Sequence, residues 1–414
     1  MSHRRRPTSS LTRMVTTLAL AAASTLLAAG SSTAAEPAAV AAATGPEAAV
    51  TDHLHERGQQ RAGALASGDR PVVKVTREAG AWAHGTAVLA TEPGSDRMPE
   101  GWLFIAHRDG GSWQVAFDGE PRFAELSARS TLTRAAEKPL FAEQDGRQVS
   151  AAGRPGVTTG ITPLAGSDFR TGMALPWANG QTWTMTSGPH GWGGSEAPWS
   201  SMDFAGGDQT VRATRGGTAY TMCTGWIRVI HDRGYSTDYY HLWSSVNVNG
   251  AAVGAGAYLG YTGTDVTCGG AASGRHVHFG LRQNSAYVGL AGHGLGKWSM
   301  ENGGSAYQGS ALHGSARVVA PGNLYNYGAL GLNQGVIDAN GGGSVNKRTG
   351  PGTGYGLSGS VADGATVTVS CSSNGTSHTG RYGTSSLWNR LSDGTWVSDA
   401  YMWTGVNGTI NGYC

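Results

Sequence analysis

Charged side chains are scarce in this sequence. Only 14% of its 414 residues are Asp, Glu, Lys or Arg, and the formal net charge is +2. Globular domains usually contain about 25% charged residues, and disordered chains combine high charge with few aromatic residues. With 13 Trp and 14 Tyr, this chain is expected to fold. Its small net charge gives no reason to expect a nucleic-acid partner.

Long apolar runs are missing after the N-terminus. Four arginines within residues 4–13 precede an apolar run at 14–29, and small residues follow at 32–35. This order is typical of a secretory signal peptide, and the run is shorter than the roughly 20 residues of a membrane span. Residues 1–35 are therefore predicted to be a signal peptide, with a retained anchor as the alternative. We expect a secreted protein with no membrane partner after signal removal.

Cysteine is rare, and two common catalytic or metal motifs are absent. The chain has four cysteines and neither a Cys-x-x-Cys nor a Gly-x-Ser-x-Gly motif, which disfavours a thiolate zinc site and an α/β-hydrolase serine. In an exported protein four cysteines indicate two disulfides, for which three pairings exist. Pairing Cys223 with Cys268 and Cys371 with Cys414 keeps each bridge within one glycine-rich segment, and we favour it.

The composition changes near residues 151–168. Residues 36–165 contain 16 acidic and 13 basic side chains, whereas the much longer stretch 166–414 contains 12 and 13. Helix-like runs at 51–65 and 120–134 and strand-like runs at 72–75, 87–90, 102–107 and 113–117 predict an α+β segment at 36–165. We interpret it as a pro-region that is later removed, with a permanent accessory domain as the alternative.

The next segment, 166–325, has strand signals at close spacing. They fall at 182–186, 210–213, 218–222, 227–230, 237–241, 258–261 and 276–281, with Gly-rich turns between them and no long amphipathic helix. This pattern predicts an antiparallel all-β domain. The whole chain is therefore expected to be mainly β, with a linker at 326–340 and a small β-barrel at 341–414.

A His-x-His pair in the last of these strands suggests chemistry. Alternate side chains of a strand share a face, so His276 and His278 point one way while Val277 and Phe279 point the other. The backbones of the two histidines are then about 7 Å apart, close enough to serve one metal site. Taken alone, such a pair is more often an outward polar face.

Three further residues accompany the pair. His190 lies in a turn-rich segment, and His241 lies at an aromatic strand end. Asp203 stands between Met202 and Phe204, near a core where an unpaired carboxylate is costly. Each of these residues alone is explained by a structural hydrogen bond. Together with the His-x-His pair they indicate a metal site.

These motifs resemble those of the lysostaphin-type zinc metallopeptidases, most closely the beta-lytic and staphylolytic branch. The matching elements are His190, Asp203, the run Tyr239-Tyr240-His241-Leu242, and the run His276-Val277-His278-Phe279. Arg275 and Val277 depart from the residues usual in that family. The resemblance covers about residues 170–320. It implies a groove across an antiparallel sheet, with His190, Asp203 and His278 holding one Zn²⁺ per catalytic domain.

The resemblance also assigns the remaining site residues. His241 and His276 would flank the bound water and the scissile carbonyl, and we favour His276 as general base and His241 as a transition-state donor, an order that the sequence cannot establish. Three protein ligands leave one zinc position open, which marks a catalytic site. Aromatic residues that could wall the substrate groove are Trp192, Trp199, Tyr240 and Trp243.

The C-terminal segment, 341–414, is similar to the bacterial Src-homology-three-like barrel. The similarity rests on residues 344–352, 361–369 and 393–397, and such barrels often bind cell-wall peptides. Trp388, Trp396, Tyr401 and Trp403 could form a contact surface or simply the core.

The function expected from this resemblance is a secreted, wall-associated zinc metalloendopeptidase. It would be a monomeric zymogen that hydrolyses peptide bonds of bacterial peptidoglycan, at Gly-containing cross-links, by metal-activated water. Two alternatives remain: an extracellular protease of Gly-rich proteins such as elastin, and a non-catalytic wall-binding protein on the same scaffold.

Overall fold

A computed structural model describes residues 45–62, 68–144 and 168–414. The expected signal peptide and the boundary near 151–168 lie outside the described residues, apart from Asp168. No helix among the described residues is long and apolar enough to cross a membrane. All described residues fall in one unit of the chain, 42–414.

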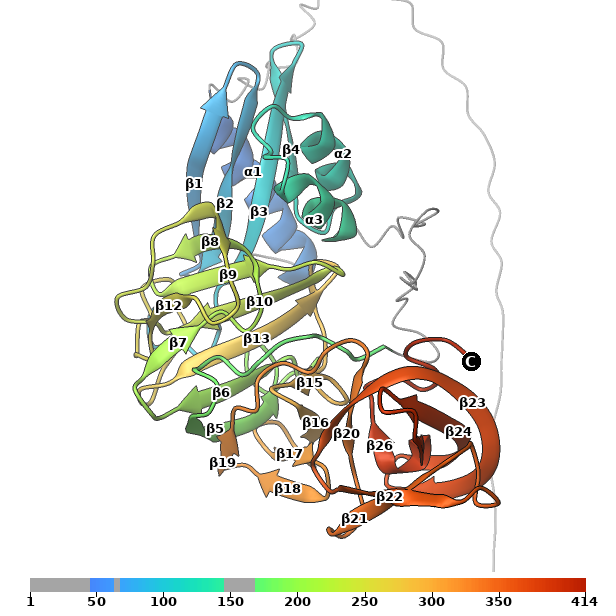
Figure 1. Cartoon of the computed structure of the whole chain (residues 1–414). Helices are drawn as coiled ribbons and strands as arrows, with labels where there is room; N and C mark the ends of the chain where they lie inside the picture. Colours follow the sequence, from blue (N-terminus) through green and yellow to red (C-terminus); the bar gives the residue numbers. More distant parts are fainter. Residues whose placement is uncertain (1–44, 63–67, 145–167) are drawn as a thin grey trace, which may run out of the picture. The chain divides into compact units, whose positions relative to one another are not determined.

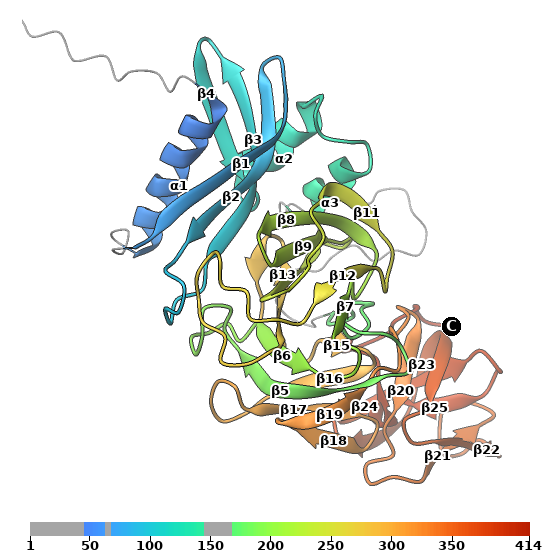
Figure 2. The same ribbon diagram turned by 90° about the vertical axis from the view of Figure 1, so that its left-hand side faces the viewer.

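The N-terminal region (45–62 and 68–144) is a four-stranded antiparallel sheet with helices (Figures 1 and 2). Its strands pair in the order β1-β2-β3-β4, and the strand-like runs expected at 72–75, 87–90, 102–107 and 113–117 lie within these four strands. Val50 and Leu54 of α1 pack on one face, and Phe123 and Phe141 of α2 and α3 pack on the other. The elements are α1 (Pro46–Ala62), β1 (Arg70–Ala79), β2 (Trp82–Ala90), β3 (Glu100–Asp109), β4 (Ser112–Phe117), α2 (Pro121–Arg129) and α3 (Glu137–Gln144).

The helix expected at 120–134 is shorter than predicted, and α3 was not predicted at all. Pro121 begins α2, and the helix ends at Ser130, whose backbone is extended. The Ser130 hydroxyl accepts a hydrogen bond from the Leu132 amide at 3.0 Å. This local bond competes with helix continuation, so α2 ends before the predicted limit at residue 134.

The central feature is a nine-stranded antiparallel sheet. Its order is β11-β8-β9-β10-β13-β6-β5-β19, and β14 pairs with β13. The prediction of a mainly β, antiparallel fold is confirmed. The strands are β5 (Thr182–His190), β6 (Ser201–Ala205), β8 (Gly217–Cys223), β9 (Trp226–Ile230), β10 (Tyr235–Tyr240), β11 (Asn249–Val253), β13 (Val277–Gln283), β14 (Ala286–Tyr287) and β19 (Gly322–Tyr325).

Two smaller sheets accompany it. One pairs β7 (Thr210–Arg212) with β12 (Tyr258–Tyr261). The other contains β15 (Gly294–Leu295), β16 (Trp298–Asn302), β17 (Gly309–His313) and β18 (Ala316–Val319) in that order.

Side-chain alternation decides what each face of the central sheet carries. Met202, Phe204, Val277 and Phe279 are fully buried in one apolar core. The side chains between them, those of Asp203 and His278, therefore point to the opposite face. The strand register sets these two residues directly opposite each other across β6 and β13.

The C-terminal residues form a seven-stranded antiparallel sheet in the order β22-β21-β25-β24-β23-β20-β26. Strand β20 falls within the segment expected to be a linker, because Val336 and Ile337 are buried in the C-terminal sheet. The elements are β20 (Gln334–Ile337), β21 (Ser344–Arg348), β22 (Leu357–Ala362), β23 (Thr366–Gly380), β24 (Gly383–Leu391), β25 (Trp396–Ser398), a 3₁₀ turn (Asp399–Tyr401) and β26 (Met402–Trp403).

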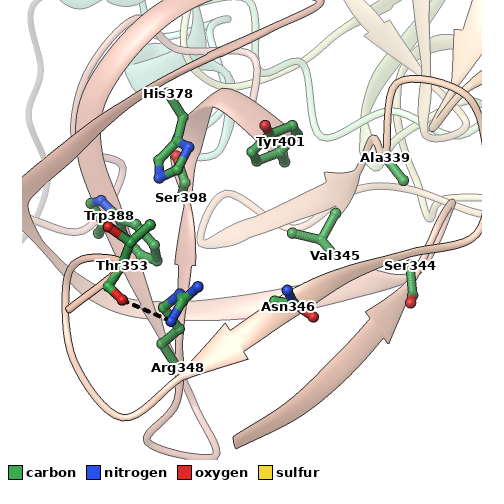
Figure 3. A pocket seen from close by; sticks show the side chains of 10 residues that line it. All are labelled: Ala339, Ser344, Val345, Asn346, Arg348, Thr353, His378, Trp388, Ser398 and Tyr401. Atoms are coloured by element: carbon green, nitrogen blue, oxygen red, sulfur yellow. Dashed lines mark hydrogen bonds between the residues drawn. The ribbon is translucent and has the colours of Figure 1, made fainter. Parts of the chain in front are cut away.

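The aromatic residues of this sheet divide between core and surface. Trp388, Trp396 and Trp403 are buried, and Tyr401 is half-buried. Figure 3 shows a pocket that Trp388 and Tyr401 line together with Arg348, whose Nη1 donates to the Thr353 carbonyl at 3.0 Å. Membership of the Src-homology-three-like group stays a prediction.

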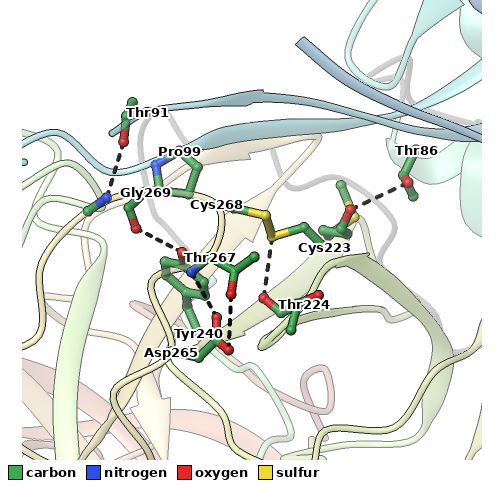
Figure 4. The surroundings of a disulfide bond; sticks show 12 residues. Thr86, Thr91, Pro99, Cys223, Thr224, Tyr240, Asp265, Thr267, Cys268 and Gly269 are labelled. Atoms are coloured by element: carbon green, nitrogen blue, oxygen red, sulfur yellow. Dashed lines mark hydrogen bonds between the residues drawn. A yellow bond between two sulfur atoms is a disulfide. The ribbon is translucent and has the colours of Figure 1, made fainter. Parts of the chain in front are cut away.

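Both disulfides are formed with the pairing favoured from the sequence. Cys223 at the end of β8 joins Cys268, and Cys371 in β23 joins Cys414. Figure 4 shows the first bridge between the sheet and the loop that carries Asp265, Thr267 and Gly269. That loop also bears a carbonyl that orients a site histidine, described next.

Candidate metal centre

Three of the predicted residues converge on one point. The Nδ1 atom of His278 lies 2.9 Å from Oδ1 of Asp203. The Nε2 atom of His190, at the end of β5, lies 3.4 Å from His278 Nδ1 and 3.7 Å from Asp203 Oδ1. One ligand atom from each residue therefore lies within 4.8 Å of the other two. These separations are short enough for all three to bind one ion.

Two more histidines border this group. The rings of His241 and His276 are 4.8 Å apart, and the His241 ring is 5.9 Å from that of His278. The Nε2 atom of His276 lies 3.6 Å from Oδ1 of Asp203. The five side chains of His190, Asp203, His241, His276 and His278 are called the histidine–aspartate cluster below. The structure thus brings together every catalytic and metal-binding residue expected from the sequence.

Backbone carbonyls orient all four imidazoles. The Nδ1 atoms of His190, His241 and His276 lie 2.7–2.8 Å from the carbonyl oxygens of Gly188, Asp265 and Gly274, respectively. A ring nitrogen that faces a carbonyl oxygen must carry the hydrogen, so Nε2 of each neutral ring is left with a lone pair.

His278 contacts its backbone carbonyl through the other ring nitrogen. Its Nε2 atom lies 3.3 Å from the carbonyl oxygen of Trp192, which leaves Nδ1 free toward Asp203. Carbonyl partners of this kind are the usual support of metal-binding histidines, because they fix both the tautomer and the ring orientation.

Three members of the cluster, His190, His241 and Asp203, have pKa values shifted toward the forms that bind a metal. Burial lowers the pKa of His190 to about 4, and burial together with the neighbouring His278 and His276 lowers the pKa of His241 to about 3. For Asp203, burial alone raises the pKa, but the neighbouring imidazoles, His278 foremost, outweigh burial and hold the pKa below its usual range. Neutral imidazoles and an ionised carboxylate are the forms that bind a metal.

The donor set fits Zn²⁺. Two imidazole nitrogens and one carboxylate oxygen form a three-ligand set that leaves a coordination position open, as catalytic zinc sites do. The residues that would hold the ion are His190 through Nε2, Asp203 through Oδ1 and His278 through Nδ1. Their role as ligands stays a prediction.

The four aromatic residues predicted to wall the groove are placed differently from one another. Trp192 lies 4.8 Å from the His278 ring and Tyr240 lies 4.4 Å from the His241 ring. Both are buried, whereas Trp243 is 43% exposed and stacks under Arg275. Among the described residues no ring contact or hydrogen bond joins Trp199 to the histidines; its Nε1 donates to the Ser195 carbonyl.

Sequence reasoning missed Tyr307. Its ring stacks on the His190 ring at 4.3 Å, and its backbone pairs with Gly188 and Pro189. The residue lies between β16 and β17, in a segment without a recognisable motif. Only the backbone pairing, which the sequence does not reveal, brings it to the cluster.

A comparison with known protein families matches the part of the chain that carries these residues. Residues 197–290, which contain four of the five cluster residues, match the description "Peptidase family M23". This part of the chain belongs to peptidase family M23. His190 lies just before the matched range.

Similar proteins include M23 peptidases. The chain is 34% identical over 146 residues to Protease LasA of Pseudomonas aeruginosa, which is 33% of this chain and 35% of LasA. It is 26% identical over 146 residues to Beta-lytic metalloendopeptidase of Lysobacter enzymogenes, which is 33% of this chain and 82% of that protein. The chain thus spans about a third of the length of LasA, the first of these relatives.

A solved structure described as "A Novel M23 Metalloprotease Pseudoalterin from Deep-sea" is also similar. It is 32% identical, covers 38% of this chain and 99% of its own chain, and has a TM-score of 0.36.

Proposed function

We propose that this chain is an exported zinc metalloendopeptidase that hydrolyses peptide bonds in bacterial peptidoglycan. The observation that carries the proposal is the convergence of His190, Asp203 and His278 within 4.8 Å, with His241 and His276 beside them. The M23 match over residues 197–290 and the names of the similar proteins, a protease and a beta-lytic metalloendopeptidase, support the same reading.

The residues of the histidine–aspartate cluster have different chemical roles. When bound, zinc lowers the pKa of a water molecule to roughly 7 and polarises a carbonyl oxygen. His276 presents a lone pair at Nε2, because its Nδ1 donates to Gly274, and it is positioned to take the proton of the attacking water. The proton can then pass to the amine that leaves when the peptide bond breaks.

The tautomer of His241 changes the role expected for it from the sequence. A neutral His241 cannot donate through Nε2, since its Nδ1 hydrogen is bonded to the Asp265 carbonyl. We therefore propose that Nε2 of His241 accepts a hydrogen bond from the attacking water or from a substrate N–H, and so orients it. His276 remains the general base.

The wider setting of the enzyme is part of the same proposal. The signal-like N-terminus supports export through residues 1–35, and the separate C-terminal sheet supports attachment to the wall by residues 341–414. We propose in addition that the enzyme is a monomer. One zinc ion per chain is expected.

Digestion of purified walls tests this function. The zinc-loaded chain is incubated with peptidoglycan and, in parallel, with elastin, and the fragments are identified by mass spectrometry. Soluble wall peptides with newly formed amino termini are the expected result. Cleavage of elastin without wall cleavage would favour the protease of Gly-rich proteins, and a chain that purifies without stoichiometric zinc and cleaves neither would favour a wall-binding protein.

A further inference from the structure

A cavity of about 690 Å³ lies where the small sheet β15–β18 meets the C-terminal sheet. It is lined by Phe169 and by residues of the segments 291–312 and 382–408, and we call it the junction cavity. The two sheets are joined beside it, because the Phe169 amide donates to the Gly405 carbonyl at 2.7 Å. Sites for small ligands usually have volumes of about 300–1,000 Å³ and often lie at such junctions. No member of the histidine–aspartate cluster lines this cavity, so it is a separate candidate site.

The charges of the junction cavity disfavour an anionic ligand. Among the described residues that line it, Glu301 and Asp399 are acidic and none is basic. Glu301 is paired with Arg317, at 2.7 Å, from outside the lining. Asp399 accepts only from neutral groups, Asn389 Nδ2 at 2.9 Å and Ser385 Oγ at 3.3 Å. Since a carboxylate offers about four acceptor positions, Asp399 can accept further hydrogen bonds from ligand hydroxyl groups.

The other lining groups suit a ligand with many hydroxyl groups. Tyr382 lines the cavity and is 41% exposed, and Phe169 and Trp403 add apolar surface. Within the described part of the chain, the Tyr382 hydroxyl and the side-chain amides of Asn302 and Asn407 form no hydrogen bond. An amide both donates and accepts, and an exposed aromatic ring can pack against the C–H face of a sugar. The lining therefore matches a neutral sugar better than a charged peptide.

The connection between β16 and β17 links the junction cavity to the histidine–aspartate cluster. Asn302, at the end of β16, lines the cavity and also a smaller hollow of about 370 Å³ that follows this connection. Tyr307, five residues later, stacks on the His190 ring at 4.3 Å, and its carbonyl accepts from the Gly188 amide at 2.8 Å. Five residues span at most about 18 Å. A peptide attached to a sugar near Asn302 can therefore reach the cluster within about five extended residues.

We propose that the junction cavity binds a neutral oligosaccharide, of the kind that forms the glycan strand of peptidoglycan, and holds the strand while its peptide reaches the histidine–aspartate cluster. Tyr382 packs against a sugar ring, Asn302 and Asn407 hydrogen-bond its polar substituents, and Asp399 accepts from a hydroxyl. The inference rests on the proposed function in one respect, namely that the sugar bound there belongs to the substrate. Sugar binding itself requires neither zinc nor peptide hydrolysis.

Calorimetric titration of the zinc-free full chain tests the proposal. The neutral probe is the trimer of N-acetylglucosamine, the anionic probe is the trimer of galacturonic acid, and the cationic probe is the deacetylated glucosamine trimer. The neutral trimer is expected to bind at least about 10-fold more tightly than the anionic one, because two carboxylates and no basic group line the cavity. Equal binding of the anionic trimer, or tighter binding of the cationic trimer, overturns the proposal of a neutral sugar site.

Variants at exposed positions assign the binding to the junction cavity. Tyr382→Ala and Asn302→Ala are each expected to weaken binding of the neutral trimer about 10-fold, through loss of ring packing and of hydrogen bonds, respectively. Tyr413→Ala is the matched control, because Tyr413 is an exposed tyrosine of the C-terminal region outside the lining, and it should bind normally. Circular dichroism verifies folding. If Tyr382→Ala does not fold, Asn302→Ala decides, and unchanged binding in the folded variants overturns the site.

Kinetics of the zinc-loaded chain separate this proposal from the proposed function. Tyr382→Ala is expected to raise KM about 10-fold for wall fragments that keep their sugars, with kcat unchanged, and to leave KM unchanged for the same peptides without sugars. An equal rise in KM for both substrates overturns the role of the cavity in holding the strand. Trimer binding without any wall digestion contradicts the proposed function alone, whereas wall digestion without trimer binding contradicts the sugar site alone.

Discussion

The two faces of the central sheet carry different kinds of side chain on the same strands. On β13, Val277, Phe279 and Leu281 enter an apolar core, whereas His278 and Arg282 point to the other face. Strand β9 repeats the division, with Ile227 and Val229 in the core and Arg228 opposite. The first face is a continuous apolar core, whereas the second combines a further apolar cluster around Trp192 and Trp226 with the residues proposed to bind a metal.

This division means that stability and chemistry can be changed separately. Neighbouring residues of one strand differ in role because their side chains point in opposite directions, although both are buried. Substitutions at adjacent positions should therefore have effects of different kinds.

The largest effect is expected for His278→Ala on the second face. The variant loses one of three proposed ligands, so both bound zinc and wall lysis should fall to background while the sheet remains folded. Zinc is measured by elemental analysis, lysis by the clearing of a wall suspension, and folding by circular dichroism. Lysis at the wild-type rate would show that the ligand assignment is wrong.

A smaller loss of activity is expected for His241→Ala. His241 orients reactants but is not a proposed ligand, so the variant should keep one zinc per chain and lose about 10²- to 10⁴-fold in kcat. Elemental analysis and steady-state kinetics on the same preparation check both parts. Loss of zinc from this variant would place His241 among the ligands.

Phe279→Ala tests the opposite face at the neighbouring position. Removing a fully buried ring from the core should lower the free energy of unfolding by about 3–5 kcal/mol. The variant should still bind one zinc per chain at a temperature where it is folded. Urea unfolding gives the first quantity, and a normal free energy of unfolding with lost zinc would contradict the separation of the two faces.

The smallest effect concerns acid stability, through a buried histidine of the N-terminal region. His84 of β2 lies among Phe104, Phe141 and Tyr220. Burial, and then the charge of Arg77, lower its pKa to about 3, against the opposing influence of Glu137. The unfolded chain, with a pKa near 6.5, binds the proton more readily.

The contribution of neutral His84 is therefore complete above pH 6.5. It is lost as the pH falls from about 6.5 toward 3, by at most about 1.4 kcal/mol per pH unit. Urea unfolding at pH 7 and pH 5 should show this decrease, and His84→Gln, which does not titrate, should reduce it. An unchanged pH dependence in His84→Gln would remove His84 as its cause.

The sequence predicted the elements that depend on local pattern. Alternation at 276–279 placed two histidines and two apolar residues on opposite faces, and Met202 and Phe204 indicated that Asp203 lies near a core. The disulfide pairing followed from keeping each bridge local. These features depend on the strand period and on chain separation, both of which are visible in a single sequence.

Long-range contacts could not be predicted from the sequence. The carbonyls of Gly188, Asp265 and Gly274 decide the histidine tautomers, yet any residue supplies a carbonyl. Trp192 was predicted to wall the groove. Its side chain is instead buried, and its Nε1 donates to the Pro99 carbonyl. The fit of Gly101 against Trp226 depends on two segments far apart in the chain, and nothing in either segment alone indicates it.

Anomalous diffraction at the zinc absorption edge, from crystals of the wild-type chain, tests the central claim most directly. One zinc peak per chain is expected, at about 2.0–2.2 Å from Nε2 of His190, Oδ1 of Asp203 and Nδ1 of His278. A zinc-free cluster in zinc-supplied crystals, or a peak bound by other residues, would contradict it.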